Sequence, residues 1–422
     1  MKRIKTLFAM LVLALSLAQS AHAITVWYQP MPLPSPLPNG ATESNYHIRD
    51  GWLNNYYPAI KIFQDTAELK IGGWGDTYLS LLRFDTEGLP KDVTNAYLYL
   101  YSLSRNGAYP SQVALYRASS AWNTTVQWGD PNTSGVLEPY STIPPSTLPS
   151  TDAGYAYSPS PAENSFYGMW ITPFYNGWKT TPSSNYGLVI YPNDGNNYQF
   201  DYFVSSNGAD DGKRPILRLD FDPTLVLKMP FEAYNWNVGT EIGGLGCAIL
   251  HTGHTGNYYF AIDFEWRAKR ADGSMRYSSP TAENIPILAA AEGTVVSVEH
   301  NSSGFGESVV IEHGATGIRT RYSHMKIMSS GASSIPPEIY TGVIVPQGKR
   351  FGYMGTTGSS TGVHLDFTVS SKEADGLWKS TKDRPSLAKI IMEGQLLKSY
   401  QVDKCAGGVS NRYYPSSNLM VP

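Results

Sequence analysis

Residues 355–367 read GTTGSSTGVHLDF, and this stretch decides the expected fold of the second half of the chain. Its first eight residues are all Gly, Ser or Thr, which favour turns, whereas the residues after them favour a β-strand. Side chains two positions apart on a strand point to the same face, so His364 and Asp366 are expected side by side. The stretch therefore predicts a glycine-rich loop that leads into a strand with two chemically active groups on one face.

Two other segments carry the same residue types. Residues 251–264 read HTGHTGNYYFAIDF, and residues 320–324 read TRYSH. A catalytic zinc site needs three protein ligands with N, O or S donor atoms, and an open position for water. A lone histidine is usually an ordinary surface residue. Three histidines and two aspartates, set beside glycine turns and strand-like runs, instead indicate one shared site.

Short β-forming runs recur along the chain, whereas helical periodicity is almost absent. Turn-forming residues bound each run, and the chain is rich in Gly (39), Pro (29) and Tyr (29), which suits short strands and tight turns. One short helix is expected at 384–397. The sequence therefore predicts an all-β protein. The expected strands include 78–84, 96–101, 113–117, 187–191 and 216–221 in the first half, and 288–291, 294–299, 308–312, 320–324 and 363–369 in the second.

The composition changes near residues 223–230. Seven of the ten Trp lie before Pro223, whereas six of the eight His lie after it. A β-sandwich is therefore expected before this point, and a second domain with the histidine motifs after it. The predicted parts are a signal peptide at 1–23, a Pro-rich segment at 24–40, the sandwich at 41–223 and the second domain at 224–422.

The first residues predict the compartment. Lys2, Arg3 and Lys5 precede an apolar run at 7–17, and Ala21-His22-Ala23 supplies a small-x-small cleavage pattern. This is the pattern of a signal peptide, so the mature chain is expected to be secreted or periplasmic. In an oxidising compartment, the only two cysteines, Cys247 and Cys405, are expected to form a disulfide.

The charge balance narrows the possible partners. A formal net charge of −3 argues against a general binder of nucleic acid or of anionic membranes. After the signal peptide, no stretch approaches the roughly 20 continuous apolar residues of a transmembrane helix. The many Tyr, Gly and Asn residues and the few charges suit contact with a glycan or the cell wall better than contact with a charged protein partner.

The first half carries a series of short motifs in a fixed order. They are LRFD (82–85), LP (89–90), AYLYLY (96–101), TVQW (125–128), WIT (170–172), NYGL (185–188) and RPIL (214–217). In these motifs the first half resembles the DNRLRE-type domain of secreted bacterial and archaeal proteins. The resemblance implies a jelly-roll-like β-sandwich that can act as a carbohydrate-binding module.

Exposed aromatic rings would bind sugars in such a module, because the apolar face of a pyranose packs on a flat ring. Four aromatic residues in polar, loop-like contexts are candidates, and four others match framework positions and are expected in the core. The candidates are Trp52, Trp74, Tyr109 and Tyr198, and the expected core residues are Trp122, Trp128, Trp170 and Trp178.

The second half resembles the lysostaphin-type metalloendopeptidases, which cleave peptide cross-links in peptidoglycan. Besides the three histidine segments, the resemblance rests on ILAA (287–290), GTV (293–295), Gly348, Gly352 and the loop at 355–362. It implies an antiparallel β-sheet peptidase domain with one Zn²⁺ per chain. The chain is therefore expected to be a secreted zinc-dependent endopeptidase that acts on peptidoglycan.

The resemblance also implies a role for each site residue. His254 and Asp263 match the first two zinc ligands, with His251 as an alternative to His254. His324 and His364 match the catalytic histidines, which act on substrate and water. The third zinc ligand of the family is a histidine, and here that position holds Asp366.

This substitution leaves two interpretations open. Zinc accepts carboxylate oxygen, so ligation by His254, Asp263 and Asp366 is chemically possible. A second carboxylate makes the ion a weaker Lewis acid, and the shorter side chain requires the ion or the strand to shift. The chain is then either an active enzyme with a weakened zinc site, or a catalytically impaired relative that acts as a wall-binding or regulatory module.

Overall fold

Antiparallel β-strands are the main regular element of the computed structural model, so the predicted all-β class is confirmed. None of the helices in the described ranges is long and apolar enough to cross a membrane. The structure describes residues 23–29, 48–63, 66–106, 113–118, 121–123, 125–128, 156–158, 162–192, 198–231, 242–249, 260–269, 275–277, 284–372, 374–381, 384–398 and 414–415.

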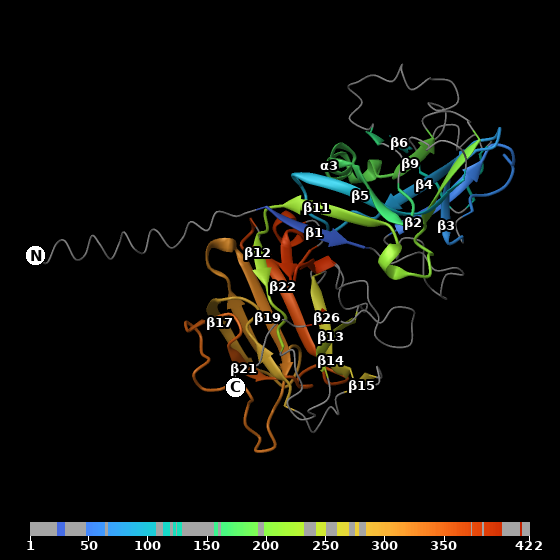
Figure 1. Ribbon diagram of the computed structural model, residues 1–422. Helices are drawn as coiled ribbons and strands as arrows, with labels where there is room; N and C mark the ends of the chain where they lie inside the picture. Colours follow the sequence, from blue (N-terminus) through green and yellow to red (C-terminus); the bar gives the residue numbers. More distant parts are fainter. Residues whose placement is uncertain are drawn as a thin grey trace, which may run out of the picture.

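The first half forms one 11-stranded sheet, in the order β1-β11-β5-β10-β3-β4-β9-β6-β7, with β2 paired to β4 and β8 paired to β5. Figure 1 shows these strands, in blue to green, grouped apart from those of the second half. Their bounds are β1 (Ile24–Tyr28), β2 (Ile48–Asn54), β3 (Glu68–Gly73), β4 (Tyr78–Phe84), β5 (Asn95–Asn106), β6 (Val113–Arg117), β7 (Ala156–Ser158), β8 (Ser165–Trp170), β9 (Leu188–Pro192), β10 (Gln199–Val204) and β11 (Ile216–Phe221).

Beside a smaller cluster of buried residues that includes Leu79 and Trp122, the strands of this sheet form one large apolar core. Leu98 of β5 and Leu219 of β11 share that core with Leu82 of β4 and Ile190 of β9. The helix α3 (Thr172–Thr180) buries Phe174, Tyr175 and Trp178 against the same core. The sequence did not predict this helix.

The second half forms a ten-stranded sheet, in the order β20-β17-β18-β19-β22-β14-β13-β26, with β15 paired to β14 and β23 paired to β22. A separate two-stranded sheet pairs β16 with β21. The bounds are β13 (Ile242–Ile249), β14 (Ala261–Lys269), β15 (Met275–Tyr277), β16 (Pro286–Leu288), β17 (Gly293–His300), β18 (Glu307–Glu312), β19 (Ile318–Met325), β20 (Ile344–Val345), β21 (Arg350–Tyr353), β22 (Leu365–Lys372), β23 (Trp378–Lys379) and β26 (Tyr414–Pro415). Short 3-10 turns lie at Pro182–Ser184, Asp211–Lys213 and Gly314–Thr316.

The helix predicted at 384–397 is wrong, because only one helical turn, α4 (Pro385–Ala388), forms there. The chain then makes a β-hairpin of β24 (Ile390–Met392) and β25 (Gln395–Leu396). Glu393 and Gly394 at its tip both have positive φ, +49° and +76°, as a two-residue hairpin turn of type I′ requires. β24 also pairs in parallel with β12 (Leu225–Leu227).

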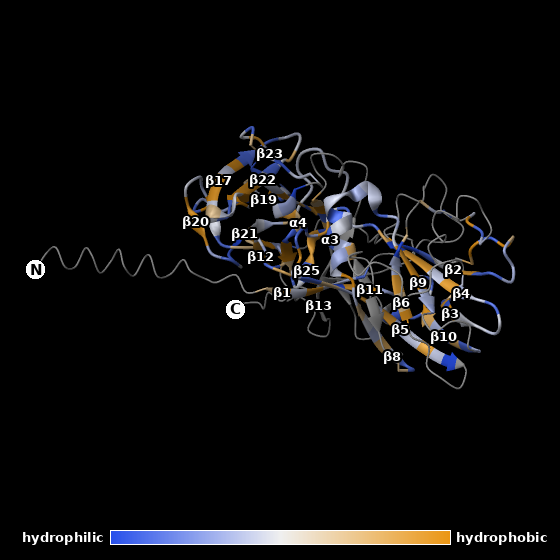
Figure 2. Cartoon of the chain, turned by 90° about the horizontal axis from the view of Figure 1, so that it is seen from above, coloured by the Kyte–Doolittle hydropathy of each residue, from blue (hydrophilic) through white to orange (hydrophobic). Residues whose placement is uncertain are grey.

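This hairpin packs on both cores. Ile391 and Leu396 belong to the core of the first half, whereas Ile390 and Met392 belong to that of the second. Figure 2 shows β1, β12 and β25 between the two groups of strands. The hairpin therefore connects the end of the second half to the first half through apolar contacts.

Several predictions fall partly or wholly outside the described residues. Residues 1–22 and 30–47 are not described, so the signal peptide and the domain boundaries stay predictions. Within the predicted Pro-rich segment, β1 pairs with β11 of the sandwich. Cys247 lies in β13, but Cys405 is outside the described residues, so the disulfide also stays a prediction.

The framework tryptophans divide into two groups. Trp122 and Trp178 are buried, as expected, with 5% and 0% of their surface exposed. Trp170 was expected in the core, but 46% of its surface is exposed, because it lies on the outward side of β8. Of the proposed sugar-binding residues, Trp52 is buried, Trp74 and Tyr198 are exposed, and Tyr109 is not described.

Candidate active site

Three neighbouring strands, β14, β22 and β19, bring together four of the predicted site residues. Asp263 lies on β14, Asp366 on β22, His364 just before β22, and His324 near the end of β19. His254 and its alternative His251 lie outside the described residues. The sheet order thus gathers residues from all three histidine segments at one end of the strands.

Asp263 and Asp366 are direct cross-strand partners on the antiparallel pair β14 and β22. Residues directly opposite each other point to the same face, a few ångströms apart, and like charges there are destabilising. Both side chains are buried, with 5% and 9% of each residue exposed. Thr368 Oγ1 donates a hydrogen bond of 3.0 Å to Asp366 Oδ1. A buried pair of carboxylates requires a compensating positive charge.

His364 adjoins this pair. Its Nε2 lies 3.8 Å from Asp263 Oδ1. Its Nδ1 lies 2.8 Å from the main-chain oxygen of Gly362. A carbonyl oxygen can only accept a hydrogen bond, so this contact places the ring proton on Nδ1. In the neutral ring, Nε2 is then free of a proton and faces the carboxylates.

A β-bulge aims His324 at the same place. The register of β18 and β19 shifts between Glu307 and Val309, so that one residue of β18 faces two of β19, Ser323 and His324. Bulges of this kind re-aim a side chain beside active sites. His324 also has a positive φ of +59°, a conformation that costs a non-glycine residue about 1–3 kcal/mol. Its main-chain N–H donates to Phe305 O at 2.9 Å.

The ring of His324 has the same tautomer as that of His364. Its Nδ1 lies 2.7 Å from Thr357 O, again a main-chain acceptor, so Nε2 is the nitrogen left without a proton. The two imidazole rings lie 4.9 Å apart, centre to centre, and are tilted by 57°. Burial is the main cause that lowers the pKa of His324, while Thr357 O and the nearby aspartates act in the opposite direction. The neutral ring is therefore the favoured form.

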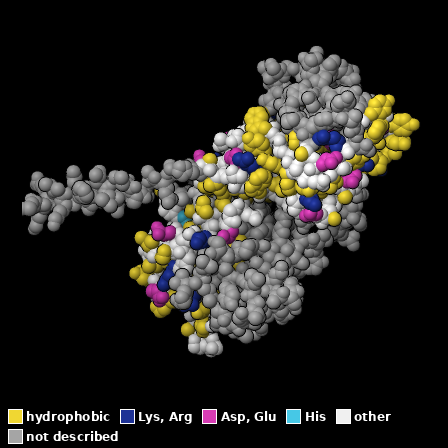
Figure 3. Space-filling model, viewed as in Figure 1, with side chains coloured by type: hydrophobic (Ala, Val, Ile, Leu, Met, Phe, Trp, Pro, Cys, Tyr) yellow, Lys and Arg dark blue, Asp and Glu magenta, His cyan; other side chains and the backbone are white. Residues whose placement is uncertain are grey.

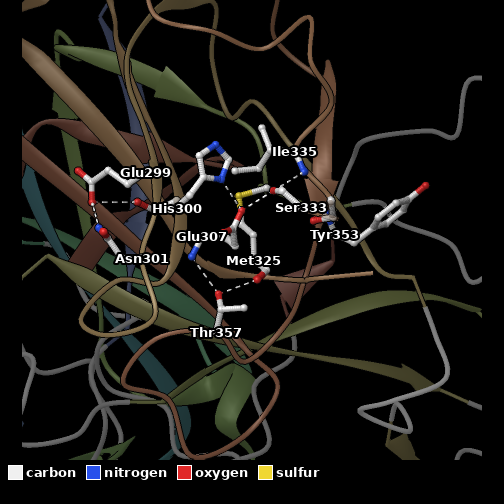
Figure 4. A network of polar contacts seen from close by, with 11 residues as sticks. Glu299, His300, Asn301, Glu307, Met325, Ser333, Ile335, Tyr353 and Thr357 are labelled. Atoms are coloured by element: carbon white, nitrogen blue, oxygen red, sulfur yellow. Dashed lines mark hydrogen bonds and ion pairs between the residues drawn. The ribbon is translucent and has the colours of Figure 1, made fainter. Parts of the chain in front are cut away.

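Thr357 holds the carbonyl that orients His324. Its Oγ1 accepts a hydrogen bond from Glu307 N at 2.9 Å and donates one to Met325 O at 2.7 Å. Figure 4 shows Thr357 joined to Glu307 and Met325, and Glu307 joined in turn to His300 and Ser333. The sequence placed Thr357 only in a glycine-rich loop, because its partners come from other strands.

The loops at 301–306 and 355–360 pack too closely for a side chain between them. Gly306 has a φ of +66°, and a Cβ there would lie 2.5 Å from Thr357. Ser359 N donates to Gly304 O, and Ser359 Oγ accepts from Gly304 N. These contacts fix the position of Thr357 and, through its carbonyl, the ring of His324.

The residues fit a divalent metal ion in their donor chemistry. Two buried, adjacent carboxylates are oxygen donors that zinc and other divalent ions accept. Within the described part of the chain, no group of three or more His, Cys, Asp and Glu side chains is placed to hold a metal. Asp263 and Asp366 could therefore supply two donors, and His254 is the residue predicted to supply a third.

Comparisons with known proteins find similarity in the part of the chain that carries the histidine motifs. The model of Peptidase family M23 matches residues 275–376. The DD-carboxypeptidase/endopeptidase Mpg of Neisseria meningitidis serogroup B is 32% identical over 91 residues, 22% of this chain and 18% of that protein. An uncharacterized metalloprotease of Haemophilus influenzae is 33% identical over 86 residues, 20% of this chain and 16% of that protein. The chain thus spans less than a fifth of the length of these curated relatives.

Among solved structures, the catalytic domain of a mutant of the prophage-encoded M23 protein EnpA from Enterococcus faecalis is 24% identical. The match covers 33% of this chain and 90% of that chain, with a TM-score of 0.23, which is too low to support any inference. Residues 275–376 of this chain therefore match Peptidase family M23, and that match includes His324, His364 and Asp366 but neither Asp263 nor His254.

Proposed function

We propose that the chain is a metal-dependent endopeptidase that hydrolyses peptide cross-links of bacterial peptidoglycan. The observation that carries this proposal is the pair of imidazoles, His324 and His364, each held by a main-chain carbonyl at Nδ1, which in the neutral ring leaves Nε2 as the nitrogen without a proton. The rings adjoin two buried aspartates on a sheet whose sequence matches Peptidase family M23 over residues 275–376. Orientation of both rings is what general acid–base catalysis requires.

The residues of the chain would divide the work of amide hydrolysis. Nε2 of one imidazole accepts the proton of the attacking water as its oxygen bonds to the scissile carbonyl carbon. That ring, now protonated at Nε2, then donates a hydrogen bond to the developing oxyanion. One ring returns the proton to the amine as the C–N bond breaks. His364 is half-buried and His324 is buried, so the site excludes most water around the reacting groups.

Asp263, Asp366 and His254 would hold the ion. When bound, a zinc ion would supply a Lewis acid that polarises the scissile carbonyl. Two aspartates neutralise the charge of a divalent ion, which weakens this effect relative to a site with one aspartate. We therefore expect a slower enzyme, or one that prefers a harder divalent ion than zinc.

The first half would hold the enzyme on its polymer. Its resemblance to DNRLRE-type domains and its antiparallel β-sheet support a glycan-binding role in a secreted or periplasmic protein. The glycan itself and the compartment are part of this proposal.

Digestion of purified sacculi tests the proposed activity. The mature chain is incubated with sacculi, with and without a chelator, and soluble fragments and newly exposed amines are measured. We expect release by the wild type, and loss of release with the chelator and in His324→Ala. Release of amines without reducing sugars would identify peptide rather than glycan cleavage. No release under any divalent ion, with sacculi still bound, would favour the catalytically impaired wall-binding module.

A further inference from the structure

One face of the first half has a composition unlike an ordinary exposed sheet face. The strands β1, β11, β5 and β8 lie side by side, and their inward residues, such as Val26, Leu219 and Leu98, are buried in the core. The outward side of an antiparallel sheet is normally polar. Here it carries aromatic rings. Figure 3 shows hydrophobic side chains gathered over this part of the first half, with charged side chains among them.

The strand register aligns four of these residues in one row. Trp27 of β1 pairs with Arg218 of β11, Arg218 with Tyr97 of β5, and Tyr97 with Trp170 of β8. We call these four residues the aromatic row. Trp27 and Trp170, its ends, are 49% and 46% exposed. Three interstrand spacings of roughly 4.8 Å make the row about 14 Å long.

Other aromatic side chains of β5 and β8 lie beside the aromatic row. The ring of Tyr99 lies 5.0 Å from that of Trp27, and Tyr101 lies 5.2 Å from Phe166. Gly168 lies opposite Tyr99, and a Cβ at Gly168 would come within 2.8 Å of that ring. The missing side chain lets Tyr99 lie across β8, between the two exposed rings of that strand.

Fixed polar groups lie among the rings. Arg218 lies over the ring of Tyr97, 5.1 Å from its centre, and donates two hydrogen bonds to Asp220. Asp220 also accepts hydrogen bonds from Thr25 and Asn95. The charge of Arg218 is thus compensated and its guanidinium keeps further N–H donors, whereas the four hydrogen bonds to Asp220 use the acceptor positions of that carboxylate.

We infer that the aromatic row binds a neutral polysaccharide, the glycan strand of the cell wall. Sugar rings present apolar C–H faces that pack on aromatic rings, and hydroxyls that bond to polar groups held between them. The compensated Arg218–Asp220 pair does not suit an anionic lipid surface, which attracts uncompensated cations. Of the outward residues described on the four strands, only Leu103 and Ile216 are aliphatic, whereas six are aromatic, so flat rings form most of the apolar surface of this face.

This inference rests on the proposed wall-binding role of the first half and specifies its surface. A second aromatic surface, around Trp74 and Tyr198, is the natural rival. Those two rings lie 6.0 Å apart and are 50% and 60% exposed. They follow β3 and precede β10, away from the register of the aromatic row.

Binding of the full chain to purified sacculi, on ice and with a chelator to stop cleavage, tests the assignment. Each lost ring of the row is expected to weaken binding about tenfold, as loss of one well-packed aromatic contact does. The variants are Trp27→Ala, Trp170→Ala and the double variant, with Trp74→Ala and Tyr198→Ala as matched controls. Trp27→Phe and Trp170→Phe keep a ring and should retain most of the binding.

Sacculi stripped of their peptides by an amidase separate glycan from peptide recognition. We expect equal binding to stripped and intact sacculi. Loss of binding in the Trp74 and Tyr198 variants alone would place the glycan-binding site around those two residues and would contradict the inference. No effect of any variant, no binding by wild type, or binding that disappears with the peptides would each overturn the inference. Because cleavage is blocked, none of these outcomes depends on peptidase activity.

Discussion

Asp263 and Asp366 lie directly opposite each other on neighbouring antiparallel strands, and both are buried. The register of β14 and β22 places the two carboxylates side by side on the same face of the sheet. A histidine at either position would remove one of the two negative charges. A bound cation, or a proton shared by the two carboxylates, would compensate their negative charge.

The first prediction concerns the two imidazoles. His324→Ala and His364→Ala are each expected to lower hydrolysis of sacculi by about 10²–10⁴-fold, the usual contribution of a general acid or base. His300→Ala is the matched control, because its side chain is 58% exposed and lies outside the site. Circular dichroism should show the native fold in all three variants. Full activity in either site variant, or unfolding of both, would contradict the assigned roles.

Thr357 is expected to act through His324. Thr357→Val removes the hydroxyl that joins Glu307 N to Met325 O, and unsatisfied buried groups of this kind cost about 1–3 kcal/mol. The free energy of unfolding in urea should fall by that amount, and kcat should fall with little change in KM. Thr356→Val is the control, because Thr356 is exposed and bonds only to Ser360 among the contacts described. Equal kinetics of the two variants would remove the positioning role.

Asp50 predicts a pH-dependent stability in the first half. Burial raises its pKa to about 6 from 3.8, against two hydrogen bonds from Ser206. The folded state therefore keeps a proton that the unfolded state loses, and this contribution to stability falls as pH rises from about 4 to about 6. Asp50→Asn lacks that loss. The stability of the variant relative to wild type, from urea unfolding, should rise across this window and level off above it.

A constant difference between Asp50→Asn and wild type from pH 4 to pH 7 would contradict this account. Asp210→Asn is a suitable control, because that side chain is 58% exposed.

Local pattern was enough to predict most of the strands. β4, β6 and β11 have the bounds expected from their alternating or β-branched runs. The local sequence pattern predicted the wrong secondary structure where tertiary packing determines it. Phe174, Tyr175 and Trp178 have β-forming side chains, but they form the apolar face of α3 after Pro173 at its start. The run at 384–397 has helical spacing, yet it forms a hairpin because β12 supplies a strand partner for Ile390–Met392.

The candidate site shows the same division. The residue types and their motifs were visible in the sequence, and four of those residues converge. The bulge that turns His324 and the carbonyls that set both tautomers were not visible. They depend on the register between β18 and β19 and on the packing of two loops far apart in sequence. No local signal predicts such contacts.

The hairpin at the end of the second half predicts a coupling between the two halves. Lys398 is fully buried, and its Nζ forms an ion pair of 2.9 Å with Asp85 and also donates to Glu87 O. Lys398→Met leaves both acceptors without that donor, so the free energy of unfolding should fall by about 1–3 kcal/mol. Lys372→Met, on an exposed lysine, is the control. Urea unfolding checks the difference, and equal stability of both variants would show that the ion pair does not hold the halves together.

The metal content of the purified mature protein, measured by elemental mass spectrometry, tests whether Asp366 helps to bind a divalent ion. Wild type is compared with Asp366→Ala and Asp366→His. We expect about one divalent ion per chain in wild type, loss of the ion in Asp366→Ala, and retention in Asp366→His. Of the two variants, only Asp366→His keeps a ligand atom at that position. A wild type without metal, and an ion gained only in Asp366→His, would contradict this expectation and leave the chain a disabled relative of the peptidases.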